Sequence, residues 1–140
     1  MTYRKKDWED AVAGLATAQD LVDQFSQDKQ KKHLLSYAIL GIWSFGEYAI
    51  NVVLELEGEP PEQNHRQADW AATLHARGVL TEDYFDRLSQ LEKYRLKASH
   101  RGYTKNRTVH FSRQDVKNCL DSMLRLKDEV EALLRARGKL

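Results

Sequence analysis

Arg95 and His100 are the two residues whose side chains most plainly offer chemistry, because a permanent cation stands five positions before a titratable imidazole. Arginine binds two phosphate oxygens at once through its planar guanidinium and stays charged. Histidine transfers protons near neutral pH. Cleavage of RNA without a metal ion needs a base for the 2′-hydroxyl, a cation for the phosphate and an acid for the leaving oxygen. The pair therefore indicates phosphodiester chemistry as the first function to consider.

Positive charge is gathered around this pair. Segment 93–114 contains seven Lys and Arg residues and no Asp or Glu, whereas the net charge of the whole chain is only +1. A local field of that kind attracts phosphate in a salt-dependent way. The candidate nucleic-acid contacts are four cations and an aromatic ring that can stack on a base: Lys97, Arg101, Lys105, Arg107 and Tyr103. Tyr94 is a second stacking candidate, and the competing interpretation is an ordinary solvated loop.

Helices must position these groups, since apolar residues recur at three- to four-residue steps along most of the chain. We expect helices over about residues 7–28, 30–57 and 64–77, a fourth with Thr81 as its N-cap and a last one after Ser112. The second is apolar around much of its circumference, which is typical of the central element of a bundle. The chain is therefore expected to be all-α, a single domain over residues 1–140 built as an up-and-down bundle of four to five helices.

Particular residues also predict where these helices begin and end. Gly58 and Gly78 can adopt the left-handed conformation that terminates a helix, and Ser112-Arg-Gln-Asp115 resembles a capping box. On an ideal helix the Arg95 and His100 side chains start roughly 140° apart. They converge only if the fourth helix turns before His100, which the small Ser99 and the following Gly102 would allow.

Glu47 stands in the otherwise apolar second helix and shares a stripe with Asn51. One interpretation is that both face the Arg95 region and orient Arg95 or the substrate. The other is that the stripe is simply the wet side of the helix. A buried carboxylate needs a partner, and Arg95 is a suitable one.

The sequence gives little support for a disulfide, a membrane span, a metal site or a nucleotide-binding motif. Cys119 is the only cysteine, so no intrachain disulfide can form, which fits a reducing cytoplasm. The charge-free part of the most apolar stretch covers only residues 34–46, short for a membrane span. His33, His65 and His75 have no metal-ligand spacing, and no phosphate-binding glycine motif occurs. We therefore expect no metal, no cofactor and no membrane association.

The run RLKASHRGYT, the basic loop after it and FSRQDVKNCLDSML resemble the end of a HEPN domain. Members of that superfamily are small helical bundles with an Arg-x4–6-His motif, often a Tyr after the His, and a polar-capped final helix. Arg95 and His100 match the motif, Tyr103 resembles the trailing Tyr, and Ser112 would be the cap. The resemblance implies a metal-independent endoribonuclease that works as a homodimer. It also implies a toxin or antiviral effector, in some cases neutralised by a nucleotidyltransferase-type antitoxin.

Two positions depart from the family pattern. Leu96 stands where the residue after the motif Arg is usually polar, so Lys97 or Ser99 would have to orient the catalytic groups. Tyr103 lies three residues after His100 rather than two. A catalytically inactive helical module that binds nucleic acid or a protein partner through segment 93–114 is therefore the alternative. A helix-turn-helix DNA reader over residues 64–100 is disfavoured, because the basic charge follows the candidate recognition helix.

Overall fold

The computed structural model describes residues 2–27, 33–99 and 111–140. Those residues form five helices and no strand, which confirms the all-α helical bundle expected from the sequence. In chain order the helices are α1 (Lys5–Gln27), α2 (His33–Leu56), α3 (Gln67–Ala76), α4 (Phe85–Ser99) and α5 (Arg113–Ala136).

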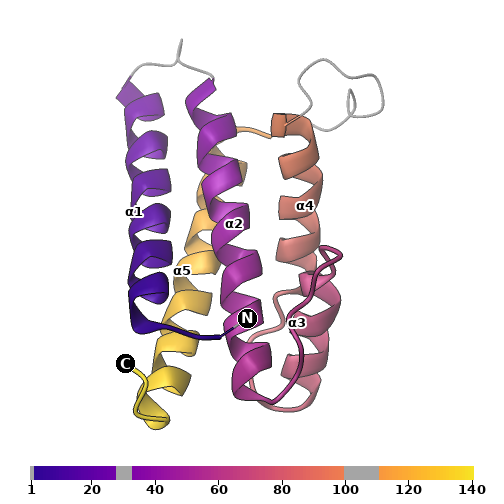
Figure 1. The fold of residues 1–140 in the computed structure, drawn as a ribbon. Coiled ribbons are helices and arrows are strands. Elements are labelled where there is room, and N and C mark those ends of the chain that lie inside the picture. Colours follow the sequence, from indigo (N-terminus) through magenta and orange to yellow (C-terminus); the bar gives the residue numbers. More distant parts are fainter. Residues whose placement is uncertain (1, 28–32, 100–110) are drawn as a thin grey trace.

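The four long helices α1, α2, α4 and α5 alternate in direction, and the short α3 lies in the connection between α2 and α4 (Figure 1). Helix α2 packs against each of the other four helices. Its side chains Ile39, Ile42, Ala49 and Ile50 are completely buried. A helix that is apolar on several sides is stable only when it is covered on those sides, so α2 is the central element that its composition predicted.

By length and composition, α2 is also the one helix among the described residues that could cross a membrane. More than half of its most apolar window is buried inside the bundle. The core helix of a globular protein passes the same test, and the covering of α2 by its neighbours favours that interpretation.

The helix ends confirm three of the local predictions. Gly58 and Gly78 have φ values of +75° and +77°, in the region that glycine adopts without steric cost. At the start of α5 the Ser112 side chain accepts from the Asp115 N–H at 3.2 Å, and the Ser112 N–H donates to Asp115 Oδ2 at 2.8 Å. These reciprocal bonds are the predicted capping box.

The start of α4 corrects the sequence prediction. Thr81 is not its N-cap, because the Thr81 N–H and hydroxyl both donate to Glu129 Oε1 on α5, at 2.6 and 2.8 Å. The helix begins at Phe85, and the Phe85 N–H donates to Asp83 Oδ1 at 2.9 Å. The same Glu129 accepts from the Tyr84 hydroxyl at 2.6 Å. A distant carboxylate thus competes successfully for Thr81, and Asp83 supplies the local acceptor.

Candidate functional site

Arg95 lies on α4 with only 18% of its side chain exposed. Its guanidinium forms an ion pair with Glu92, one turn earlier on the same helix, through Nη2 and, at 3.4 Å, through Nε. The guanidinium carbon also lies over the Trp43 indole of α2, 4.6 Å from the ring centroid. The cation is therefore held in place by a carboxylate from the preceding turn of α4 and by an aromatic face from α2.

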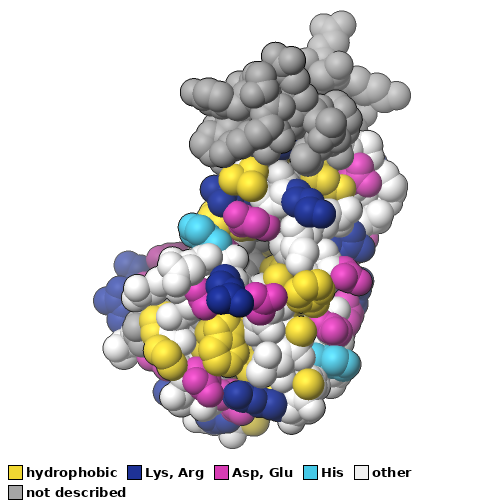
Figure 2. Space-filling model, turned by 90° about the vertical axis from the view of Figure 1, so that its right-hand side faces the viewer, with side chains coloured by type: hydrophobic (Ala, Val, Ile, Leu, Met, Phe, Trp, Pro, Cys, Tyr) yellow, Lys and Arg dark blue, Asp and Glu magenta, His cyan; other side chains and the backbone are white. Residues whose placement is uncertain are grey.

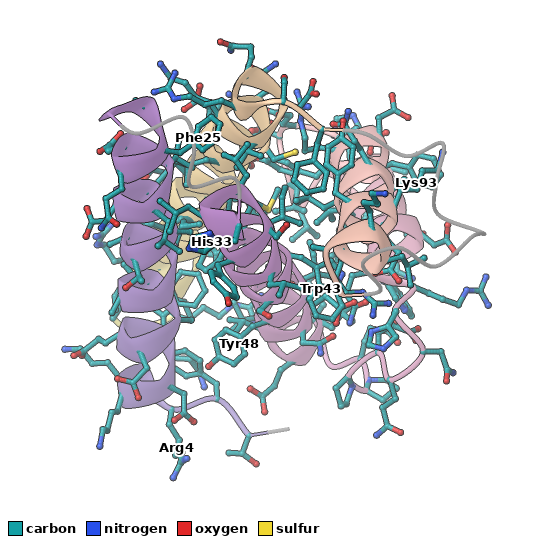
Figure 3. The ribbon with its side chains drawn as sticks, turned by 90° about the horizontal axis from the view of Figure 1, so that it is seen from above. Arg4, Phe25, His33, Trp43, Tyr48 and Lys93 are labelled. Carbon is teal, nitrogen blue, oxygen red and sulfur yellow. The ribbon has the colours of Figure 1, made fainter. Side chains whose placement is uncertain are left out.

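Trp43 binds the same carboxylate. Its indole Nε1 donates to Glu92 Oε2 at 2.7 Å. Figure 3, which looks along the bundle, shows Trp43 on the side of α2 that faces α4. Glu92 thus receives hydrogen bonds from Trp43 and Arg95 together, and the three side chains tie α2 to α4.

Glu47 lies one turn after Trp43 on the same face of α2. Both of its carboxylate oxygens are within 3.0 Å of His65 Nδ1, in the connection between α2 and α3. The His65 ring also packs against Trp43, with the ring centroids 5.4 Å apart. We call the set Trp43, Glu47, His65, Glu92 and Arg95 the α2–α4 polar cluster. Figure 2 shows histidine, acidic and basic side chains lying side by side at the left edge of the molecule.

The electrostatics of Glu47 reflect this setting. Burial raises the pKa of its carboxyl, and the hydrogen bond and charge of His65 oppose that rise. The Glu92 carboxylate raises the pKa further, and the Arg95 guanidinium lowers it. The net result is a pKa above the ordinary value. The expectation that Arg95 would be the partner of Glu47 is wrong: His65 takes that role, because Arg95 is engaged by Glu92 on its own helix.

The backbone at His65 is unusual among the described residues. Its φ is +57°, the only positive φ outside glycine in that part of the chain. The connection is anchored by Asn51, whose side-chain oxygen accepts from the Glu62 N–H at 3.0 Å. Asn51 therefore holds the loop that carries His65, a supporting role different from the predicted orientation of Arg95.

Gln67, at the start of α3, lies beside the α2–α4 polar cluster and has a buried polar side chain. It is only 4% exposed, and its amide nitrogen donates to the Glu62 carbonyl at 3.2 Å. Its Oε1 is buried and has no hydrogen-bond partner among the described residues. Gln67 lines a cavity of about 20 Å³ together with members of the cluster: Trp43, Glu47, His65 and Glu92. Buried polar atoms are nearly always paired in native proteins, so this acceptor marks a place where a donor is expected.

Several predicted residues fall outside the described part of the chain: His100, Arg101, Tyr103, Lys105 and Arg107. Lys97 lies in the last turn of α4 and is partly exposed, and Ser99 is the last residue of that helix. The backbone stays helical through Ser99, so the change of direction needed to bring His100 toward Arg95 does not occur before that residue.

Tyr94 is unavailable for base stacking, contrary to the prediction. It is 7% exposed, packs against Phe111 with ring centroids 5.2 Å apart, and its hydroxyl accepts from Gln90 Nε2 at 2.7 Å. The ring belongs to the junction between α4 and α5.

Sequence reasoning missed Trp43, His65 and Glu92 as members of the site. Eighteen residues separate Glu47 from His65, and forty-nine separate Trp43 from Glu92, so no short spacing connects them. The one usable signal was Glu47 itself, a carboxylate in an apolar helix that required a partner.

A larger hollow of about 980 Å³ lies between α4 and α5. Its lining mixes acidic and basic side chains, among them Glu82, Asp86, Lys93 and Arg125. Two of these, Arg125 and Glu82, already pair with each other at 2.8 Å. Of the candidate residues named from the sequence, Tyr94 lines this hollow, whereas Arg95 and Glu47 do not. The α2–α4 polar cluster contains both Arg95 and Glu47 and is therefore the stronger candidate.

Among the described residues, no three His, Cys, Asp or Glu side chains come together in a way that could hold a metal ion. Comparison of the chain with models of known families, with curated proteins and with solved structures found no significant match. The candidate site therefore has to be interpreted from its own geometry.

Proposed function

We propose that this protein is a metal-independent endoribonuclease of HEPN type, in which Arg95 binds the scissile phosphate and His100 transfers a proton. The observation that supports the proposal most is the placement of Arg95. Its guanidinium is held between Glu92 and the Trp43 ring in the last two turns of α4, the helix that leads directly to His100. Positioned cations of this kind stabilise charge that develops on a phosphate in the transition state.

The proposed reaction is an internal phosphoryl transfer. A base removes the 2′-hydroxyl proton, and the 2′-oxygen forms a bond to phosphorus. The bond from phosphorus to the 5′-oxygen breaks, and an acid protonates that oxygen. The products are a 2′,3′-cyclic phosphate and a 5′-hydroxyl, and no oxidant, reductant or cofactor takes part.

The phosphate has to reach a guanidinium that already has a carboxylate partner. An incoming phosphate either adds to the Arg95–Glu92 arrangement or displaces Glu92, and both events require the Arg95 charge. The basic residues of segment 93–114 would raise the local concentration of RNA. Lys97 is partly exposed in the last turn of α4, where it can take part in that attraction.

The proposal also includes the oligomeric state of the protein and its biological role. One cleavage event needs both an acid and a base, and the motif supplies one histidine per chain, so two chains sharing a site is a chemical reason to expect a homodimer. The HEPN resemblance adds a toxin or antiviral role, a nucleotidyltransferase-type antitoxin as partner, and the cytoplasm as compartment.

The second candidate is a catalytically inactive module that binds nucleic acid or a protein partner. The ion pair between Arg95 and Glu92 favours it, because a neutralised guanidinium contributes less to phosphate binding. The apolar Leu96 beside the motif Arg agrees with it.

Incubation of the purified protein with a structured RNA in EDTA separates the two candidates. We expect cleavage with cyclic phosphate ends that falls by about 100-fold or more in both Arg95→Ala and His100→Ala. Arg4→Ala is the matched control, since Arg4 also pairs with an acid three residues away but lies just before α1. Intact RNA with retained, salt-sensitive binding would exclude the nuclease and support the binding module.

A further inference from the structure

We propose that His65, oriented by Glu47, is a second proton-transfer group of the site that contains Arg95. The inference rests on the proposed ribonuclease function and names a residue that neither the Arg-x4-His motif nor its spacing indicates. It adds to the Arg95 site an imidazole that lies within the described residues.

The first argument is the shared contact with Trp43. The His65 ring and the Arg95 guanidinium both lie against this indole, the ring with its centroid at 5.4 Å and the guanidinium carbon at 4.6 Å. Both groups therefore border the same indole, so a single nucleotide of RNA can contact the guanidinium through its phosphate and the imidazole through its ribose. Proximity of a cation and a proton-transfer group to the same phosphate is the arrangement that the reaction needs.

The second argument is the division of exposure between His65 and Glu47. The imidazole is 51% exposed, whereas the carboxylate is 18% exposed. The exposed member can meet a substrate, and the more buried member can orient it. Catalytic imidazoles are commonly held in this way by a carboxylate that does not itself contact the substrate.

The third argument concerns the tautomer. Both Glu47 oxygens face Nδ1, at 3.0 and 2.9 Å. An ionised carboxylate can only accept, so this contact assigns the proton to Nδ1. In the neutral ring Nε2 is then the basic atom, and it is the nitrogen that would exchange protons with RNA.

The fourth argument is the backbone of His65. A φ of +57° is costly for a residue with a Cβ, and it persists only where the surroundings impose it. Here the Asn51 side chain anchors the loop at Glu62, and the ring reaches Glu47 and Trp43. Glycine would adopt this positive φ at a lower free-energy cost if the loop only had to turn. We therefore infer that the imidazole of His65 has a role that offsets the backbone strain.

The fifth argument identifies what part of a substrate would enter. Gln67, whose Oε1 is buried and has no hydrogen-bond partner among the described residues, lines the cavity of about 20 Å³ together with His65 and Glu92. That volume takes one small polar group and excludes a base ring. A hydroxyl of the ribose satisfies both conditions, because it is small and donates a hydrogen bond to a carbonyl oxygen.

The test compares the pH dependence of kcat/KM for RNA cleavage in wild type and His65→Asn. Asparagine tolerates positive φ, and its side-chain amide neither gains nor loses a proton near neutral pH. We expect a loss of about 30-fold or more and the disappearance of one limb of the pH profile. His75→Asn is the matched control, because His75 bonds the Leu80 carbonyl through Nδ1 and lies outside the cluster. Glu47→Gln should displace the same limb without removing it, since Glu47 acts only through His65.

A second variant distinguishes loss of the imidazole from loss of the folded structure. His65→Gly removes the imidazole and relieves the backbone, and added imidazole should restore part of its cleavage but none of that of Arg95→Ala. The inference is overturned if Arg95→Ala and His100→Ala are inactive while His65→Asn keeps both its rate and its pH profile. In that case the ribonuclease proposal stands. If wild type itself leaves RNA intact, the ribonuclease proposal fails, and the role of His65 fails with it.

Discussion

The Arg95 guanidinium lies over the Trp43 indole across the interface between α4 and α2, with its carbon 4.6 Å from the ring centroid. The same indole donates its N–H to Glu92 at 2.7 Å, and Glu92 is the ion-pair partner of Arg95. Trp43 therefore positions the cation in two ways, through the face of its ring and through the carboxylate. Helix packing and the geometry of the candidate site depend on one side chain.

Replacing Trp43 separates these two contributions. Trp43→Phe keeps an aromatic face but removes the donor to Glu92, a hydrogen bond to a charged group. We expect the free energy of unfolding to fall by about 1–3 kcal/mol, part of it from the smaller ring. Urea denaturation measures the change. Trp70→Phe is the control, because its N–H bond to Glu62 is longer, 3.3 Å, and Arg77 lies farther from its ring, 5.9 Å. An equal loss in both variants would contradict a special role for Trp43.

The raised pKa of Glu47 predicts how its contribution to stability varies with pH. In the unfolded chain its carboxyl has the ordinary, lower pKa, so the unfolded state ionises first as pH rises. The stability that Glu47 contributes is thus fully present below the ordinary pKa and is lost as pH rises through the folded pKa. Glutamine does not ionise, so Glu47→Gln should gain stability relative to wild type as pH rises from the ordinary carboxyl pKa through the raised pKa of the folded state.

Denaturation of both proteins at several pH values checks this sign. The difference in unfolding free energy should change steadily in favour of Glu47→Gln as pH increases. A difference that is constant with pH would show that burial and the His65 contact cancel in setting the pKa. A difference that turns in favour of wild type would show that the His65 contact outweighs burial.

Gly46 tests the close approach of α2 to its neighbours. A Cβ at this buried position would lie 2.9 Å from Leu88 Cδ2 and 3.0 Å from Met123 Sδ. Gly46→Ala should therefore lower the free energy of unfolding by about 1 kcal/mol, since overpacking exceeds the gain in helix propensity. Gly14→Ala is the matched helical control, because nothing lies within 4 Å of the Cβ that alanine would add, and it should stabilise by about 0.5–1 kcal/mol. Equal effects of the two substitutions would refute this account of the packing.

Ser112 tests the start of α5. Ser112→Ala removes the acceptor for the Asp115 N–H and should cost about 1 kcal/mol of unfolding free energy. Thr17→Ala is the comparison, because that hydroxyl bonds the Ala13 carbonyl inside α1, where alanine is the better helix former. Thermal unfolding should give a lower Tm for the first variant and an unchanged or higher Tm for the second. A capping role is refuted if Ser112→Ala unfolds like wild type.

The fold was largely predictable because its signals are local. The apolar repeat of α2 and the glycines at 58 and 78 act within a few residues, and the structure confirms each of them. The prediction failed at Thr81 because Glu129, forty-eight residues away, offers a better bond than the helix that Thr81 was expected to cap. It failed at Tyr94 because a ring among cations looks exposed in the sequence, whereas Phe111 covers it in the bundle.

The sequence by itself determined approximately where the helices form and that α2 is central, and it left open whether Glu47 faces solvent or has a partner inside the bundle. These properties follow from periodicity, capping and the cost of burying charge, all of which are readable over a few residues. Only the tertiary structure decided that the partner is His65, that Glu92 and Trp43 hold Arg95, and that an unpaired Gln67 oxygen lies beside them. Those relationships join residues far apart in the chain, and they depend on how α2, α3 and α4 pack, which no local pattern encodes.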